Sequence, residues 1–155
     1  YFISISGAEP QRTLFEERVL EQVGDLPGRV VVALGKPDGE TRTLNRDRVI
    51  IYSYLNRQDQ QAMMNRARLV ICRSGYTTLM ELAQLTKPAL FVPTPGQSEQ
   101  EHLADYHYRQ GHTYAVNQND LDLARDVAEA EKYPGLPRVP PTEDSIRRFL
   151  EAISA

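Results

Sequence analysis

The sequence contains little cysteine, no tryptophan and no excess of basic charge. Its one cysteine, Cys72, cannot form a disulfide within the chain, so packing must hold the core together. Eighteen basic against twenty-one acidic side chains give a net charge of -3, which argues against nucleic acid as a partner. No apolar run approaches the ~20 residues of a membrane span, and no signal-peptide pattern opens the chain. We therefore expect a cytoplasmic domain without a membrane span.

Several catalytic and metal-binding motifs are also missing. The histidines, His102, His107 and His112, have neither the spacing nor the cysteine partners of a zinc site, so we expect no bound metal. The sequence has no nucleophile elbow, no phosphate-binding P-loop and no dinucleotide fingerprint. Cys72 ends an apolar run, where a small core residue is expected rather than a nucleophile. No side chain stands out as a general base, so the catalytic residue is unknown from the sequence.

With 155 residues, the chain has the size of a single globular domain. Apolar runs alternate with amphipathic stretches, and the polar residues 36–47 show no helical periodicity. We expect strands over residues 1–6, 29–35, 49–54, 69–72, 89–92 and 113–116, and helices over 14–23, 58–68, 78–85, 98–110, 121–130 and 142–155. This alternation predicts an α/β fold, a Rossmann-like three-layer sandwich with a mostly parallel, about six-stranded sheet over residues 1–155.

The loop after the fourth expected strand carries residues suited to a phosphate. In such sheets, ligands bind beyond the carboxyl ends of the strands, at the switch point in strand order. Gly75 lets a ligand approach the backbone, and the following helix start offers free N–H groups and threonine hydroxyls. Glu81, one turn into that helix, can accept hydrogen bonds from a ribose diol. The alternative is that Ser74 or Thr77 only caps the helix, and that the negative charge of Glu81 only stabilises the positive N-terminal end of the helix.

Two further loops lie at strand ends. Residues 93–102 concentrate amides and carboxylates, which suit sugar hydroxyls, with Ser98 as the expected helix cap. The alternative for this loop is a plain turn followed by a solvated, acidic first helical turn. Residues 6–12, with the sequence SGAEPQR, follow the first strand with small side chains and lead into a helix. The alternative for this loop is an ordinary turn with a proline at the helix start.

Together these loops resemble the carboxyl-terminal domain of glycosyltransferase family 28, the MurG-like group. The resemblance is best over residues 49–118 and is carried by Cys72–Gly75, then Thr78 and Glu81, then the segment KPALFVP at 87–93, then Gln100. It implies one half of a GT-B fold, in which two Rossmann-like domains face each other across a cleft. This half would hold a UDP-sugar donor, and the amino-terminal acceptor domain would be missing from the chain.

The resemblance also assigns roles to individual residues. Diphosphate binding would fall to Ser6, Gly7, Ser74, Gly75, Tyr76, Thr77 and Thr78, ribose binding to Glu81, base binding to the backbone at Leu55 and Asn56, and sugar binding to Gln97, Gln100 and Glu101. Three departures stand out. Glu101 occupies a position where the family often has a second glutamine. The first loop reads SGAEPQ instead of a double-glycine turn, and residues 36–47 are too short and polar for the usual crossover helix.

The activity implied is inverting transfer of a hexosyl group from the UDP-sugar to an acceptor hydroxyl. Backbone amides and the helix start would stabilise the leaving diphosphate, without a cofactor, and a base would come from the amino-terminal domain. That domain is the expected partner, in cis or as a separate subunit. The chain alone should then bind a uridine nucleotide and transfer nothing. Two alternatives stay open: a nucleotide-sugar hydrolase or epimerase of GT-B-like fold, and a non-catalytic nucleotide-binding subunit of a two-subunit transferase.

Overall fold

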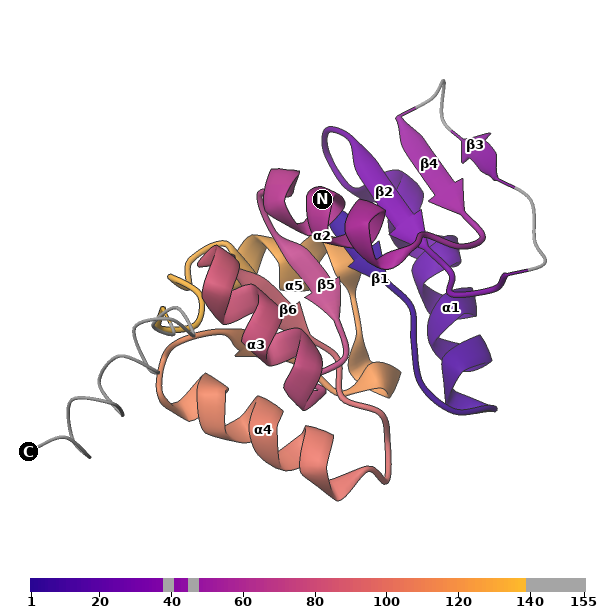
Figure 1. Cartoon of the computed structure of the whole chain (residues 1–155). Helices are drawn as coiled ribbons and strands as arrows, with labels where there is room; N and C mark the ends of the chain where they lie inside the picture. The colour runs from indigo at the N-terminus through magenta and orange to yellow at the C-terminus, as the bar shows by residue number, and fades with distance from the viewer. Residues whose placement is uncertain (38–40, 45–47, 139–155) are drawn as a thin grey trace, which may run out of the picture.

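The computed structural model of the chain describes residues 1–37, 41–44 and 48–138, so the helix expected over 142–155 lies outside the described residues. A seven-stranded sheet lies between two layers of helices (Figure 1). The strands are β1 (Phe2–Ser4), β2 (Val30–Ala33), β3 (Arg42–Leu44), β4 (Val49–Tyr52), β5 (Val70–Cys72), β6 (Ala89–Phe91) and β7 (Tyr114–Ala115). The α-helices are α1 (Gln11–Gln22), α2 (Arg57–Arg66), α3 (Tyr76–Leu85), α4 (Ser98–Arg109) and α5 (Leu123–Ala130).

Six of the strands run parallel, which confirms the predicted α/β fold. The order across the sheet is β3-β4-β2-β1-β5-β6-β7, and only β3 pairs antiparallel, with β4. β3 corrects the expectation that residues 36–47 contain no element. Its three residues, Arg42–Leu44, form a ladder with residues 49–51 at the sheet edge, a backbone interaction that a polar sequence does not reveal.

The core lies on both faces of the sheet, because neighbouring strand residues point to opposite sides. Ile3 packs with Phe15 of α1 and Val127 of α5, whereas Phe2 packs with Leu82 of α3 on the other face. Helices α2, α3 and α4 contribute to this second cluster. Burial on both faces explains why the central strands consist of continuous β-branched and apolar runs.

Cys72, at the end of β5, has the core role expected of it. Its side chain is buried, and burial raises the pKa of the thiol to about 12. The thiol is therefore protonated at neutral pH, which rules out a role as an activated nucleophile in this structure.

Strand order reverses at β1. From β1 the chain runs to β2, then to β3 at the sheet edge and back to β4 beside β2, before it crosses to β5 on the other side of β1. The loops after β1 and β5 therefore leave the sheet on the two sides of the switch point, at the same carboxyl edge. Figure 1 shows α1, α3 and α4 all beginning at this lower edge. The topology thus brings the predicted loops together.

Helix boundaries differ from the expected ones in small but informative ways. Helix α3 begins at Tyr76, two residues before the expected start, with Gly75 at its N-cap. Helix α4 has Gln97 at its N-cap, so the expectation of Ser98 as the cap is wrong. Within the parts of the chain that the structure describes, none of the helices is long and apolar enough to cross a membrane.

Candidate functional site

The start of α3 is open to a ligand. Gly75 occupies the N-cap with extended backbone, φ -75° and ψ 146°, and no side chain caps the helix. A Cβ at Gly75 would have no heavy atom within 4 Å, so its surroundings are clear. The first N–H groups of a helix have no intrahelical partners, and they lie at its positive end. This arrangement suits an anion such as a diphosphate.

Ser74 does not cap α3, which corrects one of the alternatives drawn from the sequence. Its side chain is fully buried, and Oγ donates to the Gln100 carbonyl at 2.7 Å. Thr77 lies inside the helix and does not occupy the N-cap. The Ser74 hydroxyl therefore joins the loop after β5 to the first turn of α4, and only the backbone of Ser74 is left to donate to a ligand.

The loop after β6 is held by the amides and carboxylate that the sequence assigns to sugar binding. Gln100 Oε1 accepts from the Thr94 N–H at 2.9 Å, and Gln100 Nε2 donates to Gln97 Oε1 at 2.5 Å. Glu101 Oε1 accepts from the Gly96 N–H at 3.0 Å. The three residues are thus brought together, and in this structure their side chains order the turn itself. Sugar binding by Gln97, Gln100 and Glu101 stays a prediction.

The loop after β1 lies against the loops after β5 and β6. Ser6 and Gly7 are exposed, and Gly7 has φ +116°, a conformation that favours glycine. A Cβ there would lie 3.4 Å from Thr94 Oγ1 and 3.8 Å from Arg73 Nε. Thr94 Oγ1 is buried and has no hydrogen-bond partner among the described residues. The loops after β1, β5 and β6 therefore meet at one point.

Arg73 connects all of these loops, and sequence reasoning missed it. The residue is 3% exposed, and its guanidinium donates to the carbonyls of Ser6, Val92 and Pro93. It also stacks over the Phe15 ring, with Cζ 4.3 Å from the centroid. Burial lowers its pKa to about 10, so it stays charged at neutral pH. The sequence places Arg73 within the matching motif, but nothing in its pattern distinguishes this side chain from a surface arginine.

The predicted ribose and base residues lie near one another, because Glu81 in the middle of α3 faces the start of α2. Glu81 is partly exposed on α3, and its Oε1 lies 3.9 Å from Arg57 Nη2 at the start of α2. Asn56 caps α2 through Oδ1, which accepts from the Asp59 N–H at 2.9 Å. Leu55 is half-buried against the second core cluster. The Asn56 side chain therefore caps the helix, and base binding by the backbone of Leu55 and Asn56 stays a prediction.

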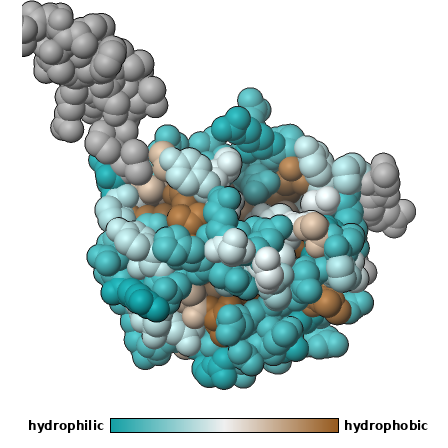
Figure 2. All heavy atoms as spheres, turned by 90° about the horizontal axis from the view of Figure 1, so that it is seen from below, coloured by the Kyte–Doolittle hydropathy of each residue, from teal (hydrophilic) through white to brown (hydrophobic). Residues whose placement is uncertain are grey.

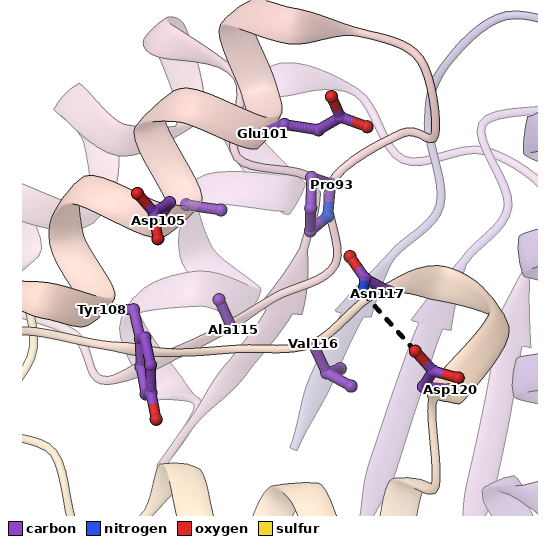
Figure 3. A pocket seen from close by; sticks show the side chains of 9 residues that line it. Pro93, Glu101, Asp105, Tyr108, Ala115, Val116, Asn117 and Asp120 are labelled. Carbon is purple, nitrogen blue, oxygen red and sulfur yellow. Dashed lines mark hydrogen bonds between the residues drawn. The ribbon is translucent and has the colours of Figure 1, made fainter.

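A pocket of about 290 Å³ lies beside the loop after β6 (Figure 3). In Figure 3 the side chains of α4 face those that follow β7, across the hollow. Its lining comprises Pro93, Glu101, Ala104, Asp105, Tyr108, Ala115, Val116, Asn117 and Asp120. Asn117 Nδ2 donates to Asp120 Oδ2 at 3.5 Å. Glu101, Asp105 and Asp120 give this pocket negative charge, so it is unfavourable for a diphosphate.

The edge that carries these loops is mainly hydrophilic. Figure 2 views the molecule from below and shows apolar patches only as separate hollows in a polar surface. In the described ranges, no group of three or more histidine, cysteine, aspartate or glutamate residues is placed to hold a metal ion. This edge offers backbone amides, a helix N-terminus, the carboxylates of Glu81 and Glu101, and a buried cation behind the loops.

Comparisons with known proteins identify relatives of the chain. A family model described as the glycosyltransferase family 28 C-terminal domain matches residues 5–134. A protein from Histophilus somni (strain 129Pt), named UDP-N-acetylglucosamine--N-acetylmuramyl-(pentapeptide) pyrophosphoryl-undecaprenol N-acetylglucosamine transferase, is 43% identical over 67 residues. This match covers 43% of the chain and 18% of that relative. The chain therefore corresponds to only a part of the proteins it matches.

Solved structures share the fold. The kitacinnamycin glycosyltransferase has a TM-score of 0.67 at 17% identity, over 86% of this chain and 35% of that one. The solution structure of ALG13 has a TM-score of 0.60 at 13% identity, over 96% of this chain and 93% of that one. At these identities the likeness concerns the fold alone.

Proposed function

Because the chain belongs to the C-terminal domain family of glycosyltransferase family 28, we propose that it is the donor-binding domain of a glycosyltransferase and holds a UDP-sugar at its carboxyl edge. The observation that carries this proposal is the meeting of the loops after β1, β5 and β6 around the uncapped start of α3. Backbone groups of Gly7 and Gly75 would face the diphosphate. Glu81 would accept hydrogen bonds from the ribose.

The remaining parts of the donor would follow the same edge in both directions. The base would lie toward α2, near the backbone of Leu55 and Asn56. The sugar would lie toward α4, near Gln97, Gln100 and Glu101, because these residues border the diphosphate loops on the side away from α2. The donor would then span the switch point from the β4 side to the β6 side.

The proposed reaction is transfer of a hexosyl group to an acceptor hydroxyl with inversion. As the bond between the sugar and the diphosphate breaks, negative charge grows on the leaving UDP. Backbone N–H groups at the α3 start are oriented before the reaction and stabilise that charge. The proposal assigns no metal or cofactor to the domain. The base that takes the acceptor proton would come from an amino-terminal domain, in cis or as a separate subunit.

Calorimetric titration of the 155-residue chain with UDP tests the binding role. We expect saturable binding and a loss of ~10- to 100-fold for Glu81→Ala, because hydrogen bonds to a charged group contribute about 1.5–3 kcal/mol. Glu21→Ala is the matched control, since Glu21 is exposed on α1 and distant in sequence from the three loops. Absence of binding heat, or equal affinity of the Glu81→Ala variant and the original chain, would refute the proposal.

The alternatives predict different outcomes. A hydrolase or epimerase would release free sugar or an epimerised donor when this domain is joined to its amino-terminal half, whereas a transferase forms a glycoside only with an acceptor. A non-catalytic subunit would bind UDP but give neither product in any combination of its natural chains. Product analysis with and without acceptor separates these three activities.

A further inference from the structure

Arg73 is a buried positive charge without a carboxylate partner. The side chain makes all its hydrogen bonds to neutral acceptors. These acceptors are the carbonyls of Ser6 at 3.3 Å, Val92 at 2.9 Å, Pro93 at 3.1 Å and Gln11 at 3.1 Å, and Gln118 Oε1 at 2.6 Å. None of the ion pairs among the described residues includes Arg73.

Burying an unpaired charge is costly for a fold. Proteins usually pair such a charge with one of opposite sign, because removal from water disfavours the charged form. The same cost lowers the pKa of Arg73 to about 10. A cation–π contact with the Phe15 ring offsets part of the free-energy cost of burying the charge. The other buried charged side chains of the described residues do lie in ion pairs: Arg12 with Glu16, and Asp126 with Arg125.

The charge lies directly behind the proposed diphosphate site. Arg73 Nε donates to the carbonyl of Ser6, and a Cβ at Gly7 would lie 3.8 Å from the same nitrogen. Arg73 is also next in sequence to Ser74, whose hydroxyl fixes the loop after β6. An anion over Gly7 and Gly75 would therefore meet this charge through a thin layer of protein, where screening by solvent is weak.

We propose that Arg73 attracts and positions the diphosphate of the donor from beneath the loops, and that this ligand supplies the counter-charge which the fold lacks. The inference rests on the proposed function. Arg73 acts through Ser6, Gly7 and the backbone before Gly75, and it makes no direct contact with the ligand in this arrangement. Arg73 is therefore a positioning residue whose charge also attracts the ligand. The ligand class it recognises is a nucleoside diphosphate.

The test compares UDP with uridine, since the two differ only in the diphosphate. Affinities are measured by calorimetry for the unaltered chain, Arg73→Met, Arg73→Lys and Glu81→Ala. For Arg73→Met we expect a loss of ~10-fold or more for UDP but less than ~3-fold for uridine, because only UDP carries the charge. Arg73→Lys should recover most of the lost UDP affinity. Glu81→Ala should weaken both ligands equally, because both contain the ribose.

A purely structural role for Arg73 gives a different pattern. If the hydrogen bonds of Arg73 serve only to order the loops, Arg73→Met weakens UDP and uridine by the same factor, and Arg73→Lys does not recover the UDP affinity. Either result overturns the inference while leaving the proposed function intact. Failure of the unaltered chain to bind UDP refutes the proposed function itself.

A second measurement on the unaltered chain decides the matter if circular dichroism shows that Arg73→Met does not fold. The ratio of UDP to uridine affinity is compared at about 0.05 M and about 0.5 M NaCl, because salt screens exposed charges far more than buried ones. We expect the ratio to fall by less than ~3-fold. A fall to a ratio near one would place the diphosphate on solvent-exposed charge and contradict the inference.

Discussion

Alanine in place of Gly7 and, separately, Gly75 should affect stability and binding in different ways. Gly7 has φ +116°, and a side chain held in such a conformation costs about 1–3 kcal/mol. The added methyl group would also lie 3.4 Å from Thr94 Oγ1, a tolerable contact, so the backbone term dominates. We expect the free energy of unfolding of Gly7→Ala to fall by about 1–3 kcal/mol, with a drop in melting temperature of roughly 2–4 °C per kcal/mol.

Gly75→Ala is the matched change. Gly75 has φ -75° and ψ 146°, which alanine adopts without strain, and its Cβ would meet nothing within 4 Å. We expect its free energy of unfolding to change by no more than ~1 kcal/mol, because alanine restricts the unfolded chain but is a poorer N-cap residue than glycine. The new methyl group would nevertheless project into the space above the α3 start. UDP affinity should therefore fall by ~10-fold or more although the fold is intact.

Urea denaturation gives the two unfolding free energies, and calorimetry gives the UDP affinities of the same samples. The reasoning on the backbone is refuted if Gly7→Ala is as stable as the original chain, or if Gly75→Ala loses more than ~1 kcal/mol. The reasoning on the site is refuted if Gly75→Ala binds UDP with unchanged affinity, since the ligand then does not approach the backbone at this residue.

Three further results follow from the structure. Ser74→Ala should lower the free energy of unfolding in urea by about 0.5–1.5 kcal/mol, because the hydrogen bond from the Ser74 hydroxyl to the Gln100 carbonyl is lost; an unchanged value would contradict the bond between the loop after β5 and α4. Burial, and then repulsion by His112, lowers the pKa of His107. At a pH just below the ordinary pKa of ~6.5, the unfolded chain therefore binds more protons than the folded chain. The free energy of unfolding should then decrease as the pH falls from about 7 to about 5. His107→Gln should flatten that dependence in urea titrations, and an unaltered slope would exclude this residue as its source. Cys72, buried with its pKa raised to about 12, should react with a thiol reagent at pH ~8 only after unfolding, and rapid labelling of the native chain would contradict its placement.

The sequence was most informative where burial alone decides the structure. The run from Val30 to Ala33 is a strand because it is covered on both faces, and its β-branched residues already indicate this. The parallel topology follows from the alternation of such runs with helices, and it places the loops at one edge. Those loops could therefore be proposed as a site before their geometry was known.

Features that depend on partners distant in sequence could not be predicted. Strand β3 exists because its backbone pairs with β4, and Arg42–Leu44 has no apolar pattern of its own. The hydroxyl of Ser74 could have capped α3, but it donates a hydrogen bond to the carbonyl of Gln100, 26 residues along the chain. Arg73 likewise gains its role only because three loops converge on its guanidinium.

A crystal structure of the chain grown or soaked with UDP tests the central claim most directly. The account predicts the diphosphate at the start of α3, between Gly7 and Gly75, with the ribose on Glu81. A nucleotide bound elsewhere, for instance in the acidic pocket beside Asp105, or crystals that stay empty at saturating UDP, would contradict it.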